Sequence, residues 1–375
     1  MKGYFDIIGS PGRIPALDGL RAIAVLLVLL RHGVLPFNYV IDEFFFANPF
    51  VNLALNGWLG VDLFFVLSGF LISYHLLEQK RRNVFTIKRY ALKRILRTVP
   101  LYYAVLVIAF AEIVPYAHAN EVLSWSAISK YLLFLQDYLG ASILVPLWSL
   151  AVEEKFYLIA PGLLFLLTLL PRGIASITII LLALGSVFTR YAVLETLEYG
   201  SYSEFFWAVR SPFHQCLDGI FLGMLVAWVV HKGQGVKPEG ERAKYVFYCS
   251  LLAALVTLMA VPYVELRWWS VTVSLVFMTS GLFALMVWAA AVDERLSEGL
   301  LGGRFFRLIA RLSYALYLTH YLFLPLALKC AQLTTGSVAL FLFWLVYLGT
   351  AFLAAVLLHL IVEKPFLLLK AKIPS

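Results

Sequence analysis

The sequence predicts an all-α integral membrane protein with about ten transmembrane helices. Of its 375 residues, 62% are hydrophobic and only 14% are charged, whereas an ordinary soluble domain carries about a quarter charged residues. Its mean hydropathy is +0.87. Apolar runs of roughly 18 to 22 residues recur along the chain, each long enough to cross a hydrocarbon core about 30 Å thick. We therefore expect the bilayer to be the solvent of this fold.

The apolar runs predict ten spans that form a single transmembrane domain over residues 1–375. No small-residue cleavage site follows the first run, which favours a permanent helix over a signal peptide. Residues 121–140 would make an eleventh span, but that count would place the basic segment 232–244 on the outer side. We therefore interpret residues 121–140 as an interfacial or re-entrant helix. The spans are expected near residues 16–35, 58–77, 98–117, 147–170, 173–190, 212–230, 245–264, 269–291, 312–330 and 338–361.

The distribution of positive charge predicts the orientation of these spans. With the N-terminus inside, 22 of the 30 Lys and Arg residues fall in inner segments and four fall in outer segments. This asymmetry obeys the positive-inside rule, so both termini are expected in the cytoplasm. The net charge of +8 is explained by this topology, and we expect no nucleic-acid partner. The three cysteines lack metal or redox spacing, so we expect neither a metal site nor a disulfide framework.

The densest positive charge lies between the second and third predicted spans. Residues 78–97 contain eight Lys and Arg residues against a single acid, Glu78. Lys80 to Arg82 fit a loop that fixes topology and contacts anionic lipid. Arg94 and Arg97 differ because they are three residues apart, on one helix face at the start of the third span. Guanidinium groups there can bind phosphates bidentately at the inner membrane surface.

The first predicted span carries polar residues that a bilayer normally excludes. Arg21 and His32 are eleven residues apart, which places them on one face of a helix and about 16 Å apart along its axis. Asp18 lies one turn before Arg21 and can form an ion pair with it. Because an imidazole titrates near neutral pH, His32 is a natural general base for a hydroxyl group.

The fourth predicted span opens with a second polar group. Ser149 is a plausible helix cap, and the helix dipole accounts for one of the two consecutive glutamates that follow. Glu153 and Tyr157 are one turn apart, and under this topology they match the height of His32, so we expect them to face it. Each remaining polar residue in a span is a functional candidate or a packing contact. The candidates of this kind are Asp62 and Ser68 in the second span, Arg210 and Asp218 around the sixth, and Ser313, Tyr314, Tyr317 and His320 in the ninth.

Five ordered motifs resemble those of the acyltransferase 3 family, the multispanning O-acyltransferases that modify surface polysaccharides, peptidoglycan and some small molecules. The resemblance covers most of the chain. One departure is Thr319, which stands where many members have Trp. A second is that we expect a stand-alone membrane core, without the esterase-like domain of fused members. The motifs are LDGLR at 17–21 followed by His32, GVDLFFVLSGF at 60–70, KRILRTVPLYY at 93–103, WSLAVEEKFY at 148–157 and LSYALYLTH at 312–320.

The resemblance implies an O-acyltransferase of a bacterial inner (plasma) membrane. Its donor substrate would be cytoplasmic acyl-CoA, with acetyl-CoA as the first choice. Its acceptor would be a hydroxyl of a glycan, a lipid-linked glycan or a small molecule. The implied catalytic residues are Arg21, His32 and Glu153. The implied donor-binding residues are Arg94 and Arg97, and we expect the neighbouring cations Arg89 and Lys93 to contribute to the same binding.

The residues leave several alternatives open. A transporter or exporter whose intramembrane Arg, His and Glu relay protons fits the helix number equally well, although the sequence lacks the repeated halves of many carriers. A non-catalytic scaffold in an envelope-polymer complex is a third possibility. Tyr157, Arg210 and His320 are unranked candidates for stabilising an oxyanion. The identity of the acceptor, the acyl chain and the choice between direct transfer and an acyl-enzyme also stay open.

Overall fold

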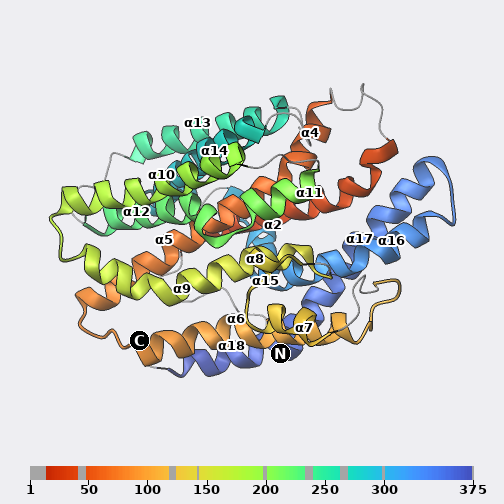
Figure 1. Cartoon of the computed structure of the whole chain (residues 1–375), viewed down its shortest axis with the longest axis horizontal. Coiled ribbons are helices and arrows are strands. Elements are labelled where there is room, and N and C mark those ends of the chain that lie inside the picture. The colour runs from red at the N-terminus through yellow and green to blue at the C-terminus, as the bar shows by residue number, and fades with distance from the viewer. Residues whose placement is uncertain are drawn as a thin grey trace.

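The computed structural model is a bundle in which every element of the described residues is helical (Figure 1). Most of the long helices run along the longest axis of the molecule. The structure describes residues 14–40, 48–117, 124–141, 143–196, 201–232, 240–261, 269–297 and 300–373.

Helices stand at all ten positions where the sequence predicts spans. The described chain also contains four short α-helices: α4 (Pro49–Leu55), α7 (Trp125–Leu132), α8 (Gln136–Leu139) and α11 (Tyr202–Phe205). The remaining α-helices are α2 (Pro15–Val34), α5 (Gly60–Arg81), α6 (Ile87–Phe110), α9 (Trp148–Leu167), α10 (Arg172–Thr196), α12 (Leu217–Lys232), α13 (Gly240–Ala260), α14 (Trp269–Val292), α15 (Arg304–Thr319), α16 (Leu324–Ala331), α17 (Gly336–Leu358) and α18 (Lys364–Ala371).

Six segments of the described chain are long and apolar enough to cross a membrane. They are Pro15–Phe37, Pro49–Arg81, Arg172–Thr196, Glu241–Ala260, Trp269–Val292 and Gly336–Ala371. At the other four predicted positions, α12 is apolar but short and α15 ends at Thr319 before a 3-10 turn. Helices α6 and α9 carry several charged residues each. The count of ten crossings therefore stays a prediction, while the all-helical membrane fold is confirmed.

Helix α6 extends further toward the N-terminus than the third predicted span. Helix α6 begins at Ile87, eleven residues before the predicted start, so Arg94 and Arg97 lie inside the helix and not at its beginning. The apolar-run criterion missed these first turns because they are rich in Lys and Arg. Residues 124–140 form the two short helices α7 and α8, and residues 121–123 lie outside the described part of the chain.

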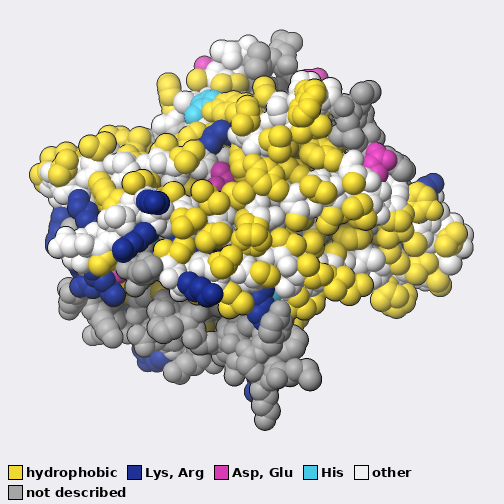
Figure 2. Space-filling view, turned by 90° about the horizontal axis from the view of Figure 1, so that it is seen from below, with side chains coloured by type: hydrophobic (Ala, Val, Ile, Leu, Met, Phe, Trp, Pro, Cys, Tyr) yellow, Lys and Arg dark blue, Asp and Glu magenta, His cyan; other side chains and the backbone are white. Residues whose placement is uncertain are grey.

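Helices α5 and α12 approach each other closely through glycines. A Cβ atom added to Gly69 would lie 2.0 Å from the carbonyl oxygen of Ile220, and one added to Gly223 would lie 2.0 Å from that of Val66. Small residues allow this spacing between helices. On the outside, Figure 2 shows a largely apolar surface on one face, with Lys and Arg side chains gathered mainly toward one end. That end carries the last turns of α5 and the start of α10 in Figure 1.

Candidate active site

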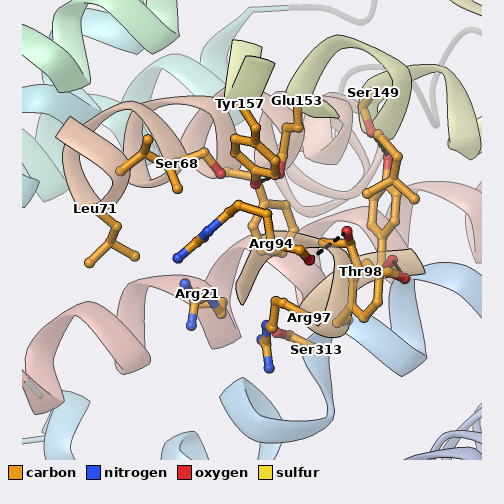
Figure 3. A pocket seen from close by; sticks show the side chains of 15 residues that line it. Arg21, Ser68, Leu71, Arg94, Arg97, Thr98, Ser149, Glu153, Tyr157 and Ser313 are labelled. Atoms are coloured by element: carbon orange, nitrogen blue, oxygen red, sulfur yellow. Dashed lines mark hydrogen bonds between the residues drawn. The ribbon is translucent and has the colours of Figure 1, made fainter. Parts of the chain in front are cut away.

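A cavity of about 120 Å³ lies between α2, α5, α6, α9 and α15 (Figure 3). We call it the inner cavity. It brings together basic, acidic and hydroxyl side chains from five helices. The residues that line it are Arg21, Phe64, Ser68, Leu71, Ile72, Arg94, Arg97, Thr98, Ser149, Leu150, Glu153, Tyr157, Ser313, Tyr314 and Tyr317.

Three guanidinium groups project to one side of the inner cavity in Figure 3. Arg21 lies 3.9 Å from Asp18, the ion pair expected from their spacing. Arg97 donates from Nη1 to Oε1 of Glu363 at 3.1 Å. Arg94 lies over the rings of two tyrosines, and its buried Nε has no hydrogen-bond partner among the described groups. Since a buried donor without a partner is costly, Arg94 is the cation best placed to receive an anion.

The opposite side of the inner cavity carries hydroxyl and carboxylate oxygens. Tyr157 donates from its hydroxyl group to Oε2 of Glu153 at 2.5 Å, one turn back on α9. In Figure 3 the hydroxyl of Ser68 points toward the same pair. Glu153 therefore faces the guanidinium groups of Arg21 and Arg94 across a small polar space.

A second cavity of about 320 Å³ contains His32, and we call it the outer cavity. Seven of its seventeen lining residues are Trp, Tyr or Phe, and the cationic side chains of Arg31 and Arg210 are among the others. The residues that line it are Val28, Arg31, His32, Leu35, Trp58, Val61, Ala141, Val145, Pro146, Trp148, Tyr202, Ser203, Phe206, Trp207, Arg210, Tyr317 and Tyr321.

The hydrogen bonds of two histidines determine which nitrogen of His32 is free. His320 Nδ1 lies 3.0 Å from the carbonyl oxygen of Leu316, which can only accept, so this nitrogen carries the proton in a neutral ring. Its Nε2 is then an acceptor and lies 3.1 Å from Nδ1 of His32, which also lies 3.0 Å from the carbonyl oxygen of Val28. Both neighbours accept, so His32 Nδ1 is the donor. We infer that His32 Nε2 carries the lone pair of a general base.

Arg210 supplies hydrogen-bond donors in the same cavity. It lies in a π-helical turn, η4 (Phe206–Arg210), and its Nη2 donates to Oδ2 of Asp62 at 2.7 Å. Its guanidinium carbon is 5.3 Å from the ring centroid of Trp58 and 5.2 Å from that of Trp148. The Nε and Nη1 atoms are buried without hydrogen-bond partners in the described structure. Asp62 thus has the partner that a carboxylate in a span requires, and Arg210 retains donors for another group.

Tyr317 lies where the two cavities meet. Among the residues that the structure describes, it alone lines both of them. Its hydroxyl donates to the carbonyl oxygen of Pro146 at 2.9 Å and lies 2.5 Å from Oγ of Ser149. The ring of Phe64 meets it edge-on at 5.9 Å. We infer that the phenol ring acts as a partition, held between α15 and the start of α9.

The expectation that Glu153 and Tyr157 face His32 is wrong. The outer cavity is lined by His32 and also by Pro146 and Trp148, so the first residue of α9 lies beside the cavity that contains His32. Glu153 lies five residues further along α9, about 7.5 Å deeper along the axis. The ring partner of His32 is His320, from the ninth predicted span.

Ser149 does not cap α9 as expected. The helix begins at Trp148, directly after the 3-10 turn η3 (Val145–Leu147), and its cap position makes no side-chain hydrogen bond. Ser149 donates instead to the carbonyl oxygen of Pro146. The first turn contains no acidic residue, so the helix dipole does not account for Glu153.

The remaining candidate residues do not line either cavity. Two residues that shape the site, Glu363 and Tyr317, were not predicted to do so. Arg89 and Lys93, on the first turns of α6, do not line the inner cavity. Glu363 binds Arg97, and the sequence analysis did not predict this contact. His359 and Glu363 are four residues apart within an apolar run, and this polar pair could have indicated a buried interaction. Tyr317 was noticed only as a polar residue of its span. The described residues contain no group of three or more His, Cys, Asp or Glu side chains that could hold a metal ion.

Comparison with known families decides which class of protein carries these cavities. The family model described as the acyltransferase domain, acyltransferase 3, matches residues 14–360. This chain belongs to the acyltransferase 3 family. The match includes every residue that lines the inner cavity and every residue that lines the outer one. No solved structure matches the chain significantly.

Several curated relatives are bacterial proteins named for O-acetyl transfer. The chain is 34% identical over 165 residues to the peptidoglycan O-acetyltransferase OatA of Listeria monocytogenes, an alignment over 40% of this chain and 24% of the relative. It is 34% identical over 162 residues to the putative peptidoglycan O-acetyltransferase YrhL of Bacillus subtilis, over 40% and 23%. It is 24% identical over 381 residues to a putative O-acetyltransferase of Staphylococcus aureus, over 94% and 57%. The alignments thus cover between about a quarter and somewhat more than half of the length of these relatives.

Proposed function

We propose that this chain is an O-acyltransferase of a bacterial inner membrane. It transfers an acyl group, acetyl in the first instance, from cytoplasmic acyl-CoA to a hydroxyl of a glycan or another envelope-associated acceptor. The observation that carries the proposal is the meeting of a basic cavity and a histidine-containing cavity at Tyr317. Family membership favours this function over an exporter with an intramembrane proton relay.

The inner cavity is suited to the donor. The phosphates of acyl-CoA would bind Arg94 and Arg97, because guanidinium groups bind phosphate oxygens bidentately. Arg89 and Lys93 lie on the preceding turns of α6 and extend the positive charge toward the end of the helix. Glu153 acts as a positioning residue in this proposal, since its carboxylate keeps the guanidinium of Arg21 oriented across the cavity.

The outer cavity is suited to the acceptor and to the chemical step. The acceptor hydroxyl attacks the thioester carbonyl carbon while Nε2 of His32 removes the hydroxyl proton. The carbonyl oxygen becomes an oxyanion, which Nε and Nη1 of Arg210 stabilise by hydrogen bonds. Collapse of this intermediate forms the new ester and breaks the carbon–sulfur bond. The CoA thiolate then takes the proton from His32, which returns to its starting state.

The contacts of the three candidates for the oxyanion donor support one of them. Arg210 shares a cavity with His32 and has two donors without partners. Tyr157 lines the other cavity, where its hydroxyl is bound to Glu153. His320 directs its acceptor nitrogen to His32. We therefore assign the oxyanion to Arg210.

Purified protein in detergent, given acetyl-CoA labelled in its acetyl group, tests the proposed reaction. We expect slow, protein-dependent loss of label to water, and faster loss when a hydroxyl acceptor is added. The matched control is His32→Gln, which should be inactive in both reactions. Absence of turnover with every acyl-CoA tested would favour the exporter or the scaffold. Mass spectrometry of envelope glycans from deletion and parent strains then identifies the acceptor.

A further inference from the structure

A third cavity, of about 420 Å³, lies away from the proposed active site. It is lined by Leu77, Lys80 and Arg81 in the last turns of α5, Thr168 and Arg172 around the turn from α9 to α10, and His231 at the end of α12. None of these residues lines the inner or the outer cavity. Helix α5 serves both regions, since Ile72 and Leu77 are five residues apart and point about 140° apart around its axis.

Positive charge in this cavity exceeds the negative charge beside it. Lys80 donates to Oγ1 of Thr168 and lies 5.0 Å from the ring centroid of Phe165, so both of these partners are neutral. Neither Lys80 nor Arg172 forms an ion pair within the described residues. Within the described part of the chain, the acid beside this cavity is Glu78, which Arg81 and Arg82 already bind and which lies 3.5 Å from Nε2 of His231.

Backbone N–H groups at the start of α10 add hydrogen-bond donors to the positive side chains of this cavity. Helix α10 is 25 residues long and begins at Arg172, so its first N–H groups have no acceptor within the helix. The positive end of the helix dipole lies at this terminus and favours an anion. A Cβ atom added to Gly173 would meet nothing within 4 Å, which shows that there is open space beside this first turn.

The surroundings indicate what kind of anion fits. Apolar side chains beside the cavity are exposed on the surface, among them Leu169 at 77% and Ile174 at 52%. Arg172–Thr196 is also one of the six segments apolar enough to cross a membrane. A ligand that fits both features has a phosphate group at one end and hydrocarbon at the other. Inorganic phosphate would satisfy the cations but would leave the apolar surface unused.

We propose that this cavity binds the phosphate group of an anionic membrane-lipid headgroup, whose acyl chains lie along α9 and α10. Basic pockets between helices at the cytoplasmic side of a bilayer bind headgroups in this way. The site would hold the turn between α9 and α10 against the ends of α5 and α12. It is independent of acyl transfer, because it shares no lining residue with the proposed active site.

Native mass spectrometry of the detergent-purified full chain, with added phosphatidylglycerol or phosphatidylcholine, tests this site. The test variant is Lys80→Gln with Arg172→Gln. Its matched control is Lys244→Gln with Arg304→Gln, which removes the same amount of charge. Lys244 and Arg304 are exposed and line none of the three cavities. We expect the test variant to lose phosphatidylglycerol affinity roughly 30-fold, because each cation near anionic headgroups contributes a factor of about five. The control should change less than twofold.

Three results would overturn the proposal. Equal losses in the test and control variants would reveal a general charge effect, and equal binding of the two lipids would remove the role of headgroup charge. Displacement of phosphatidylglycerol by millimolar inorganic phosphate would assign the cavity to free phosphate. The single variant Arg172→Gln, at an exposed position, keeps the test valid if the double variant folds poorly. Since binding is read without turnover, its failure leaves the proposed acyl transfer untouched.

Discussion

His320 Nε2 lies 3.1 Å from His32 Nδ1, across the contact between α2 and the end of α15. The two residues are separated by 288 positions in the sequence. Because His320 Nδ1 is committed to the carbonyl oxygen of Leu316, the pair fixes a single arrangement of protons in neutral rings. This relationship gives His32 a free Nε2 in the outer cavity, and the following predictions depend on it.

Replacement of the proposed base should stop the reaction without disturbing the donor site. We expect His32→Ala to lower kcat for acyl transfer at least about 100-fold, the usual contribution of a general base. Affinity for acyl-CoA should stay within a factor of about two, because the arginines that we propose for donor binding line the other cavity. Steady-state transfer rates and donor binding measured on the same preparation check this. A variant with full activity would remove His32 from the mechanism.

Replacement of His320 should lower the rate through its effect on His32. We expect His320→Phe to lower kcat about tenfold or more while leaving KM for the donor nearly unchanged, since the tautomer of His32 would no longer be fixed. His320→Asn, which can still offer an acceptor oxygen, should recover part of the rate. An NMR spectrum of ¹⁵N-histidine-labelled protein should show a changed tautomer signal for His32 in the Phe variant. An unaltered signal together with a full loss of rate would point to a different role.

The oxyanion assignment predicts an asymmetric response at Arg210. Arg210→Lys keeps a positive charge beside Asp62 but removes the fork of donors that includes Nε and Nη1. We expect kcat to fall by roughly 100-fold to 1,000-fold, the cost of losing an oxyanion donor. Size-exclusion profiles and melting temperature report on folding, because an unpaired Asp62 would itself be destabilising. Retention of the wild-type kcat in a folded Lys variant would place the oxyanion elsewhere.

Removal of the partition should admit water to the thioester. We expect Tyr317→Ala to join the inner and outer cavities and to raise the ratio of acyl-CoA hydrolysis to acyl transfer about tenfold. Tyr317→Phe keeps the ring but loses the hydrogen bonds to Ser149 and Pro146. It should therefore change this ratio much less. Release of CoA thiol with and without acceptor measures both reactions, and identical ratios in all three proteins would argue against a partition.

Donor binding should depend on Arg94 and on salt. We expect Arg94→Gln to raise KM for acyl-CoA about tenfold, since one charge-assisted contact to phosphate is lost. The rise of KM with ionic strength should become shallower than in the parent protein, because fewer charges remain to be screened. Arg304→Gln, an exposed cation outside the cavities, is the control and should leave both quantities unchanged.

Spacing along single helices was enough to predict several parts of the site. The eleven-residue separation of Arg21 and His32 placed both on one helix face, and each indeed lines a cavity. The three-residue separation of Arg94 and Arg97 likewise places both in the inner cavity. Asp18 and Arg21 form the expected ion pair. Helical periodicity carries this information because it does not depend on the rest of the fold.

Contacts between different helices could not be predicted from residue spacing. The depth at which α9 starts is set by the 3-10 turn before it, so the levels of Glu153 and His32 could not be judged from span lengths. Arg97 binds Glu363, 266 residues away, through a π-helical turn that ordinary helical periodicity does not anticipate. The role of Tyr317 as a partition appears only when the linings of both cavities are compared.

A structure of the protein with a non-hydrolysable acyl-CoA analogue tests the central claim most directly, namely that the two cavities serve one reaction. The account predicts phosphate density against Arg94 and Arg97, a displaced Tyr317 ring, and the acyl carbonyl within hydrogen-bond reach of Arg210 in the cavity that contains His32. An acyl group that stays in the inner cavity beside Glu153, with Tyr317 in place and His32 out of contact, would contradict it.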